Sequence, residues 1–251
     1  MESDIKKTVE IFWTGGYDST FRVLQLSRLP IKIRPYYLSD NRKSEQNELS
    51  AINNITAILK GRKETQCEIL PLEIISKSQR IADETITAAF QRLLKLGKIG
   101  SQYEWLGWFA KDHKGIEISV LNSPGTHLHI IIEKLGCFQL VTDEIIGDYY
   151  IIDREKSHKD LCDVFEDFHF PLFNMTKLEM KDYYLKWDCK EIMKLTWFCF
   201  RPINGKPCGL CNPCKQAISD GLKERFTKIA LFRNKLLPVR KVLIKIKKTI
   251  L

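Results

Sequence analysis

Apolar positions in the first sixty residues alternate between short continuous runs and the spacing of amphipathic helices. Residues 8–13 form an apolar run that predicts a strand, and a Gly-Gly turn separates it from a predicted helix over residues 19–26. A second apolar run over residues 31–38 predicts another strand. Residues 45–59 carry apolar side chains at helical spacing and predict a second helix.

The same alternation continues through the middle of the chain. Residues 67–75 predict a third strand, and residues 78–96 predict a longer helix with its apolar side chains on one face. The aromatic-rich segment 99–115 predicts a helix, and residues 116–121 resume the strand pattern. Strands that alternate with helices of this length form βαβ units and a parallel sheet. The predicted fold is therefore a doubly wound, mainly parallel α/β domain.

The remaining pattern is less regular. The expected elements are a helix that ends near residue 135, a strand over residues 138–141, and helices over residues 176–185 and 213–226. Thr176, with Glu179 three residues later, forms a capping box that predicts a helix start. The segment 143–173 shows neither periodicity, so no element is assigned to it.

The net charge of +9 is concentrated in one part of the chain. Residues 233–251 contain seven Lys and Arg side chains and no acid, so the other 232 residues carry only +2. Proteins that grip duplex nucleic acid usually spread their basic side chains over a surface of the fold. A nearly neutral body therefore argues against duplex nucleic acid as a partner.

No segment has the composition of a leader peptide or of a membrane span. Charged residues precede the first apolar run, and no uninterrupted apolar stretch approaches the ~18 residues that cross a bilayer. An apolar fraction of 44% with 28% charged residues is typical of a globular chain that buries a core. We therefore expect a soluble, cytoplasmic protein.

A Gly-Gly pair stands between the first predicted strand and the first predicted helix. Two glycines let the backbone turn tightly and approach an anion, because no Cβ stands in the way. The amide groups and the positive end of the helix can then bind a phosphate. The simpler interpretation is a tight turn with Asp18 or Ser19 as the N-cap. The candidate phosphate-binding residues are Thr14, Gly15, Gly16, Tyr17, Asp18, Ser19 and Thr20.

Half of the eight cysteines lie within sixteen positions, namely Cys199, Cys208, Cys211 and Cys214. Four thiolates with tight turns between them suit a tetrahedral Zn²⁺, and a site closed by four cysteines is structural. Four thiolates also suit an iron–sulfur cluster, but the spacing differs from that of the ferredoxins. The other cysteines are scattered and expected to be buried apolar residues: Cys67, Cys137, Cys162 and Cys189.

The sequence resembles a known enzyme family at both ends. Residues 14–20 resemble the Ser-Gly-Gly-x-Asp-Ser signature of PP-loop ATP pyrophosphatases, with threonine in place of the first serine. Residues 196–199 and 208–214 look like the zinc segment of the 7-cyano-7-deazaguanine synthases within that superfamily. Residues 171–179 are similar to the Pro-Leu-x-x-Leu-Thr-Lys-x-Glu stretch of the same family. The resemblance spans residues 8–220.

The resemblance implies an ATP-dependent carbon–nitrogen ligase that releases AMP and pyrophosphate. Such an enzyme adenylates a carboxylate of a 7-deazapurine-like substrate, and ammonia then yields an amide or a nitrile, as in queuosine biosynthesis. The resemblance implies that residues 14–20 hold ATP and Mg²⁺, with Asp18 and Ser19 taking part in catalysis. It also implies that the four clustered cysteines bind Zn²⁺.

The middle of the chain departs from that family. Thr126 and His127 stand where the resemblance calls for Arg-Asn, and a later Gly-Tyr-Pro-Asp-Cys-Arg stretch is missing. Neither side chain reproduces the two-pronged fork of an arginine, so a different acceptor is expected unless an arginine such as Arg154 substitutes. A tRNA-modifying PP-loop thiolase and a non-catalytic nucleotide-binding module are the alternative functions.

Three further groups have a functional and a plainer interpretation. His127 and His129 could bind a metal, but local hydrogen bonding at a helix start is favoured. The aromatic side chains of residues 99–115 could stack on a purine-like base, but a core or subunit contact is favoured. Arg42 and Glu48 follow the second strand, where doubly wound folds bind nucleotides, but an exposed helix surface is favoured.

The expected organisation has three parts. An ATP-binding α/β domain covers residues 1–195, a zinc-binding segment covers residues 196–228, and a basic amphipathic helix covers residues 229–251. Such a helix could contact anionic lipid, pack on the fold or cross a homodimer, and packing is favoured.

Overall fold

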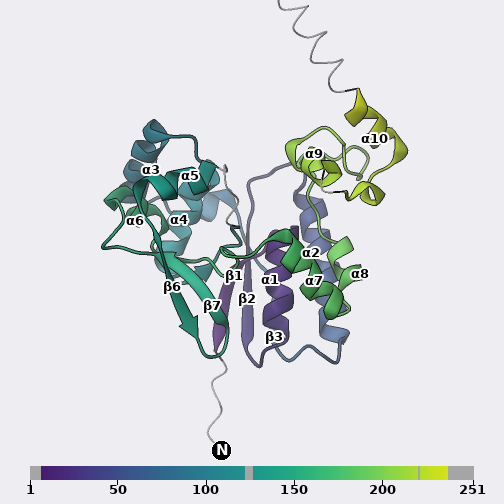
Figure 1. The fold of residues 1–251 in the computed structure, drawn as a ribbon, viewed down its shortest axis with the longest axis horizontal. Helices are drawn as coiled ribbons and strands as arrows, with labels where there is room; N and C mark the ends of the chain where they lie inside the picture. The colour runs from purple at the N-terminus through teal and green to yellow at the C-terminus, as the bar shows by residue number, and fades with distance from the viewer. Residues whose placement is uncertain (1–6, 122–126, 220, 237–251) are drawn as a thin grey trace, which may run out of the picture.

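A computed structural model describes residues 7–121, 127–219 and 221–236, with the backbone alone for residue 127. The strands of its main sheet are β1 (Thr8–Phe12), β2 (Lys32–Leu38), β3 (Glu68–Ile69), β4 (Glu73–Ile75), β5 (Ile116–Glu117) and β8 (Phe168–His169). The strands run parallel in the order β3-β2-β1-β5-β8, and β4 extends the pairing of β2 (Figure 1). The predicted α/β class with a mainly parallel sheet is confirmed.

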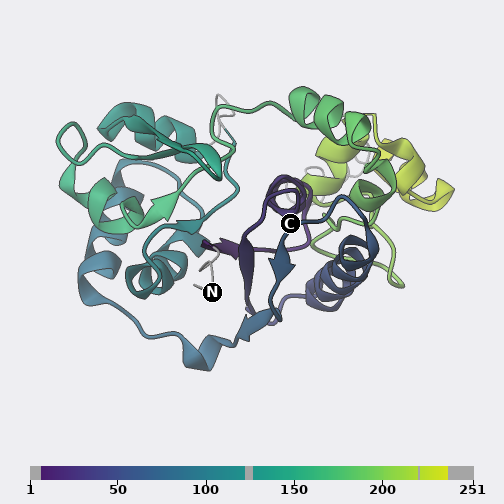
Figure 2. The ribbon, with the colours of Figure 1, turned by 90° about the horizontal axis from the view of Figure 1, so that it is seen from below.

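Helices cover both faces of this sheet (Figure 2). One apolar cluster joins the sheet to α1 (Tyr17–Ser27), α2 (Glu45–Gly61), α7 (Lys177–Lys186) and α8 (Lys190–Lys194). A second joins it to α3 (Glu84–Leu96), α4 (Gln102–Asp112), α5 (His127–Leu135) and α6 (Lys159–Phe165). Neighbouring residues of β1 contribute to opposite clusters, because Ile11 belongs to the first and Phe12 to the second.

A buried ion pair ties α1 to strand β5 of the main sheet. Arg22 donates to both carboxylate oxygens of Glu117 at 2.7 and 2.8 Å, and both side chains are almost fully buried. Arg22 also donates to the carbonyl oxygen of Ile146. The charged groups thus satisfy one another away from water, and they fix α1 against β5.

Three predicted elements are shorter than their patterns suggested. The single strand over residues 67–75 is wrong, because Pro71 lies between β3 and β4 and carries no amide for the ladder. The helix over residues 78–96 begins only at Glu84, where the Asp83 side chain caps it by accepting from the Ile86 amide. The strand over residues 116–121 ends at Glu117.

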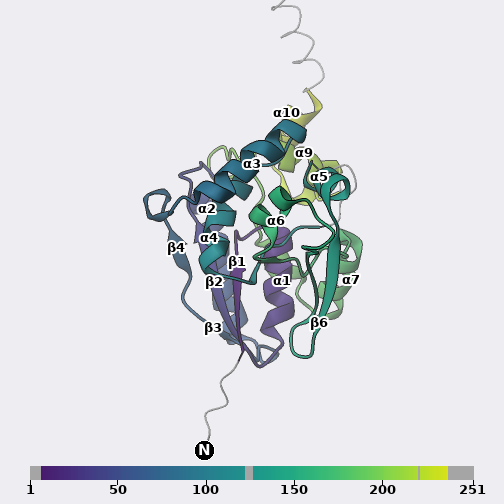
Figure 3. The ribbon, with the colours of Figure 1, turned by 90° about the vertical axis from the view of Figure 1, so that its left-hand side faces the viewer.

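The unassigned segment 143–173 contains several short elements. Strands β6 (Phe138–Asp143) and β7 (Gly147–Ile152) form an antiparallel hairpin outside the main sheet (Figure 3). The strand expected over residues 138–141 therefore exists, but it pairs with β7. After the hairpin come α6 and the two-residue β8, which are too short to show a period.

The part of the chain from Trp197 to Leu236, here called the cysteine segment, lies at the top of the molecule in both Figure 1 and Figure 3. It contains α9 (Asn212–Ser219), a 3₁₀ turn η2 (Lys223–Arg225) and α10 (Lys228–Lys235). The predicted helix over residues 213–226 is therefore wrong beyond Ser219, and Gly221 has a φ of +86° that no helix accommodates. Residues 237–251 of the predicted basic helix lie outside the described residues. Within the described part of the chain, every helix is too short or too polar to cross a membrane.

Candidate functional site

A tight turn connects β1 to α1. Gly16 is the N-cap of α1 in an extended conformation, and Gly15 has a φ of +67°. A Cβ on Gly15 would lie 2.7 Å from the carbonyl oxygen of Glu48, so the close approach of α2 admits only glycine here. The first amide groups of α1 have no partner within the helix and can receive an anion.

Two hydroxyl groups line this turn. Thr14 Oγ1 and Ser19 Oγ lie 3.2 Å apart, and the amide of Gly16 donates to Thr14 Oγ1 at 3.3 Å. Thr20 has a different role, because its buried hydroxyl accepts a hydrogen bond from Trp13 Nε1 at 3.1 Å. The turn therefore presents the hydroxyl groups of residues 14 and 19 outward and that of residue 20 inward.

A pocket of about 240 Å³ opens above the turn. It lies where strands β1, β2 and β5 end. Strand β1 has β2 as its neighbour on one edge and β5 on the other, so the order of the strands along the chain switches direction at β1. Doubly wound folds bind ligands at such a switch in strand order. The candidate residues that line it are Thr14, Gly16, Tyr17, Asp18 and Ser19, whereas Gly15 and Thr20 lie behind them.

Asp18 lines this pocket with one carboxylate oxygen left without a hydrogen bond. Its Oδ1 atom is buried and has no hydrogen-bond partner among the described residues. Burial raises the pKa of Asp18, and the positive charge of Lys177 opposes that shift only in part. A carboxylate in this condition is a ligand for a cation or a hydrogen-bond acceptor for a bound molecule.

Other buried polar atoms without a partner lie around the same pocket. Among the described residues these atoms are Asp18 Oδ1, Ser44 Oγ, Arg80 Nε and Ser119 Oγ. Ser119 lines the pocket with Asp18. Arg80 lies over the ring of the pocket residue Trp105 at 4.0 Å, and Ser44 is two residues from the pocket residue Arg42. The two unpaired atoms that share the pocket wall, Asp18 Oδ1 and Ser119 Oγ, indicate a site for a polar ligand or ordered water.

The wall opposite the glycine turn comes from α4. Tyr103 and Trp105 line the pocket, whereas Trp108 donates from its indole to Thr87 and Phe109 stacks on His113. Burial raises the pKa of Tyr103 to about 12, so its hydroxyl remains protonated at neutral pH. The aromatic segment packs against the second core cluster, in agreement with the favoured core contact, and two of its side chains also line the pocket.

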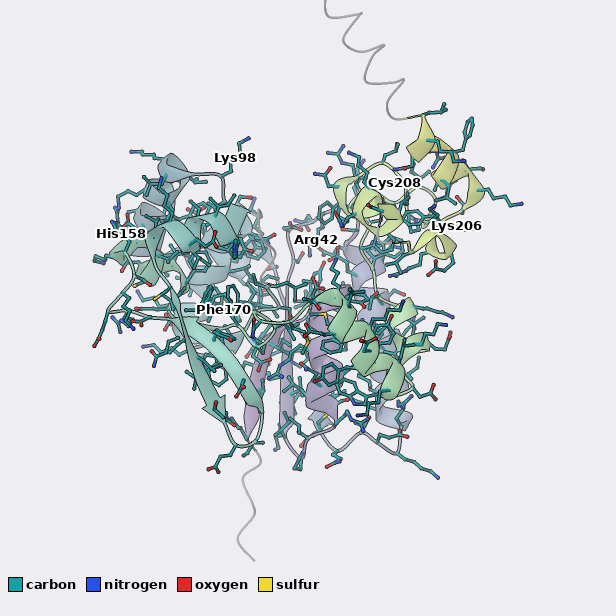
Figure 4. All side chains as sticks on the ribbon, viewed as in Figure 1. Arg42, Lys98, His158, Phe170, Lys206 and Cys208 are labelled. Carbon is teal, nitrogen blue, oxygen red and sulfur yellow. The ribbon has the colours of Figure 1, made fainter. Side chains whose placement is uncertain are left out.

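Arg42 and Glu48 are not the exposed helix residues that their pattern favoured. Glu48 is buried, and its carboxylate accepts from Arg42 Nη2 and from the hydroxyl of Tyr37, each at 2.7 Å. Arg42 lines the pocket, between the α3–α6 half and the cysteine segment (Figure 4). The arginine is therefore held in place by a buried partner on the helix that also contacts Gly15.

The four clustered cysteines converge on one point. Their Sγ atoms all lie within 4.8 Å of one another, and three of the four side chains are buried. The Sγ atoms of Cys211 and Cys214 lie 3.3 Å apart, those of Cys208 and Cys214 3.8 Å, and those of Cys199 and Cys211 3.9 Å. Thiolates about 2.3 Å from a tetrahedral Zn²⁺ lie about 3.8 Å apart, so the group can hold a metal ion such as zinc.

Backbone amides surround these sulfur atoms. The amide of Cys208 donates to Cys199 Sγ at 3.2 Å, and the amides of Leu210 and Cys211 donate to Cys208 Sγ at 3.3 and 3.4 Å. Donation from the Cys214 thiol and from the Cys208 amide lowers the pKa of Cys199. Such donors stabilise negative charge on sulfur, as a metal-binding thiolate requires.

The residues that the sequence proposed for the acceptor are only partly among the described residues. Residues 123–126 and the side chain of His127 fall outside the described residues. His129 pairs with Glu133 one turn along α5 at 2.9 Å, in agreement with local hydrogen bonding. Arg154 pairs with Glu166 at 3.0 Å, its side chain is 75% exposed, and it does not line the pocket.

No protein-family model matches the chain, and no curated protein matches it.

Proposed function

We propose that the chain is an ATP-dependent carbon–nitrogen ligase of the PP-loop kind, similar to the 7-cyano-7-deazaguanine synthases, and that it acts in the cytoplasm. The observation that carries this proposal is the buried, unpartnered Oδ1 atom of Asp18, in a pocket beside a glycine turn at the start of α1. A phosphate at the helix start and a Mg²⁺ at Asp18 would satisfy both features together.

The proposed reaction begins with attack of a carboxylate oxygen of the acceptor on the α-phosphorus of ATP. The bond between the α-phosphorus and the bridging oxygen breaks, and pyrophosphate leaves. Ammonia then attacks the carbonyl carbon of the acyl adenylate and displaces AMP, which yields an amide. Adenylation of the amide oxygen by a second ATP, followed by loss of AMP and protons, would yield a nitrile.

The described residues supply orientation and charge for these steps. Thr14 and Ser19 offer hydroxyl donors to phosphate oxygens, and the amides at the start of α1 offer more. Mg²⁺, when bound at Asp18, would neutralise the charge that develops on the departing pyrophosphate. Trp105 and Tyr103 line the pocket and offer aromatic rings on which a purine-like base could stack. We assign Zn²⁺ at the four cysteines a structural role, because all four positions are filled by protein ligands.

The arginines near the pocket favour an acceptor other than 7-carboxy-7-deazaguanine. Arg154 does not line the pocket, whereas Arg42 does. Arg42 is already paired with Glu48 and lies near Asp40, so its charge is largely neutralised. We therefore propose that 7-carboxy-7-deazaguanine is a weak substrate and that a related deazapurine or carboxylate is preferred.

The thiolase alternative finds less support in the pocket. Among the described residues, the cysteines outside the cluster do not line it, and burial raises the pKa of both Cys162 and Cys189. Sulfur atoms within 4.8 Å of one another leave room for one ion rather than for a cluster of several iron and sulfide atoms. The described residues include no clear general base. The unpartnered Oδ1 atom of Asp18 favours an enzyme over a nucleotide-binding module that has lost catalysis.

Incubation of the purified protein with ATP, Mg²⁺, ammonium and 7-carboxy-7-deazaguanine, followed by mass spectrometry, tests the proposal. AMP, pyrophosphate and an amide or nitrile are the expected products, formed with a high KM for the acceptor. Asp18→Asn is the matched variant and should form none of them. If the wild-type protein releases no AMP with any deazapurine carboxylate offered, the ligase assignment is overturned.

A further inference from the structure

Helix α10 lies at the end of the molecule that contains the cysteine segment (Figure 1). It carries an exposed apolar stripe. Ile229, Phe232 and Leu236 are 63%, 61% and 44% exposed. Spacings of three and four residues place these side chains on one face of a helix. A soluble helix normally turns such a face toward the core, so this stripe calls for an occupant.

The opposite face of α10 is already fixed to the cysteine segment. Ala230 is fully buried and packs so closely on Gly209 that a Cβ there would lie 2.2 Å from the Ala230 carbonyl oxygen. Asn234 Nδ2 donates to the carbonyl oxygen of Gly209 at 2.9 Å, and Thr227 caps the helix by accepting from the Ala230 amide. These contacts hold α10 in one orientation and leave the apolar stripe facing away from the fold.

Positive charge accompanies the stripe. Residues 225–251 contain nine Lys and Arg side chains and no acid, so residues 1–224 are neutral overall. Lys228, Arg233 and Lys235 belong to α10 itself. Residues 237–251, which lie outside the described part of the chain, continue the mixture of aliphatic and basic residues. The whole net charge of the protein is thus carried by α10 and the residues around it.

We propose that α10 binds the surface of a membrane that contains anionic lipid, through its exposed apolar stripe and its cations Lys228, Arg233 and Lys235. The aliphatic and aromatic side chains would enter the boundary between headgroups and acyl chains, and the cations would contact acidic headgroups. Nucleic acid would satisfy the cations but would leave Ile229 and Leu236 without an apolar partner. A second copy of the same face would bring two strongly positive segments together.

Flotation of the full-length protein with lipid vesicles tests this proposal. We expect binding to vesicles of phosphatidylcholine with phosphatidylserine, weak binding to phosphatidylcholine alone, and loss of binding in high salt. The double variant Ile229→Ser/Phe232→Ser should bind at least about tenfold more weakly, since two large apolar side chains no longer enter the lipid. Ile81→Ser/Leu178→Ser is the matched control, because these side chains are 79% and 74% exposed elsewhere and should leave binding unchanged.

Charge variants separate lipid from other occupants. Each of Lys228→Gln and Arg233→Gln should weaken vesicle binding by about fivefold. Equal binding to neutral and anionic vesicles, or equal loss in the control variant, would overturn the proposal. So would tighter binding to duplex DNA or RNA than to anionic vesicles, or a dimer that dissociates in the Ile229→Ser/Phe232→Ser variant. The assay uses neither nucleotide nor acceptor, so its result is independent of the proposed ligase activity.

Discussion

The backbone amide of Trp197 donates a hydrogen bond to the carbonyl oxygen of Gly15 at 2.8 Å. Trp197 opens the cysteine segment, and its indole Nε1 donates to the carbonyl oxygen of Cys199, also at 2.8 Å. One residue therefore joins the glycine turn to the four-cysteine group, although the two are far apart in the sequence. Metal binding and the shape of the candidate nucleotide site should be coupled through this residue.

We expect Cys208→Ser to lower the metal content and to weaken nucleotide binding. A structural metal supplies folding free energy to its segment, so its loss should release Trp197 from Gly15. Elemental analysis gives the metal content, which should be one zinc per chain, and equilibrium binding of a fluorescent ATP analogue gives the affinity. Cys137→Ser, outside the cluster, is the control. Unchanged nucleotide affinity after complete metal loss would contradict the coupling.

Gly15→Ala should destabilise the protein by more than Gly147→Ala. Both glycines have a positive φ, so alanine at either position costs about 1 kcal/mol in backbone strain. A Cβ at Gly147 meets nothing within 4 Å, whereas a Cβ at Gly15 lies 2.7 Å from the backbone of Glu48. Urea denaturation of the two variants isolates that contact. Equal free energies of unfolding would show that α2 simply moves away.

Asp18→Asn should stop pyrophosphate release and yet raise the melting temperature at neutral pH. Burial raises the pKa of Asp18 in the folded protein, so the fold favours the protonated carboxyl. That contribution is fully present below the unfolded pKa and is lost as the pH rises through the raised folded value. The Asp18→Asn variant should therefore be more stable than the wild-type protein above the raised pKa, and this difference in stability should disappear in acid. Melting curves across a pH series measure it, and lower stability of the variant at neutral pH would refute this account.

Glu117→Gln should destabilise the protein by about 3–5 kcal/mol, because it leaves the buried guanidinium of Arg22 without its countercharge. Asp163→Asn is the control, since Lys159 and Asp163 form a pair one turn apart on α6 with the lysine mostly exposed. That change should cost under about 1 kcal/mol. Denaturant titration compares the two variants, and equal effects would show that burial of the Arg22–Glu117 pair is unimportant.

Several features of the fold follow from local sequence alone. The first two strands and helices are long enough for their apolar spacing to identify them, and β1, α1, β2 and α2 occur close to the predicted positions. Thr176 and Glu179 form the capping box expected from their spacing. The cysteine spacing also indicates a group of four sulfur atoms, because the short turns between the cysteines restrict where those atoms can lie.

Other features depend on partners that are distant in the sequence, and only the tertiary structure decided them. The two-residue strand β8 exists because β5 offers it a ladder, and β6 lies outside the main sheet because it pairs with β7. Glu48 is buried because Arg42 and Tyr37 satisfy its carboxylate, which no helical pattern of α2 reveals. The packing around Asp18 likewise buries its Oδ1 atom and leaves that atom without a hydrogen-bond partner. The sequence does not reveal this, because burial and hydrogen-bond partners are properties of the folded chain.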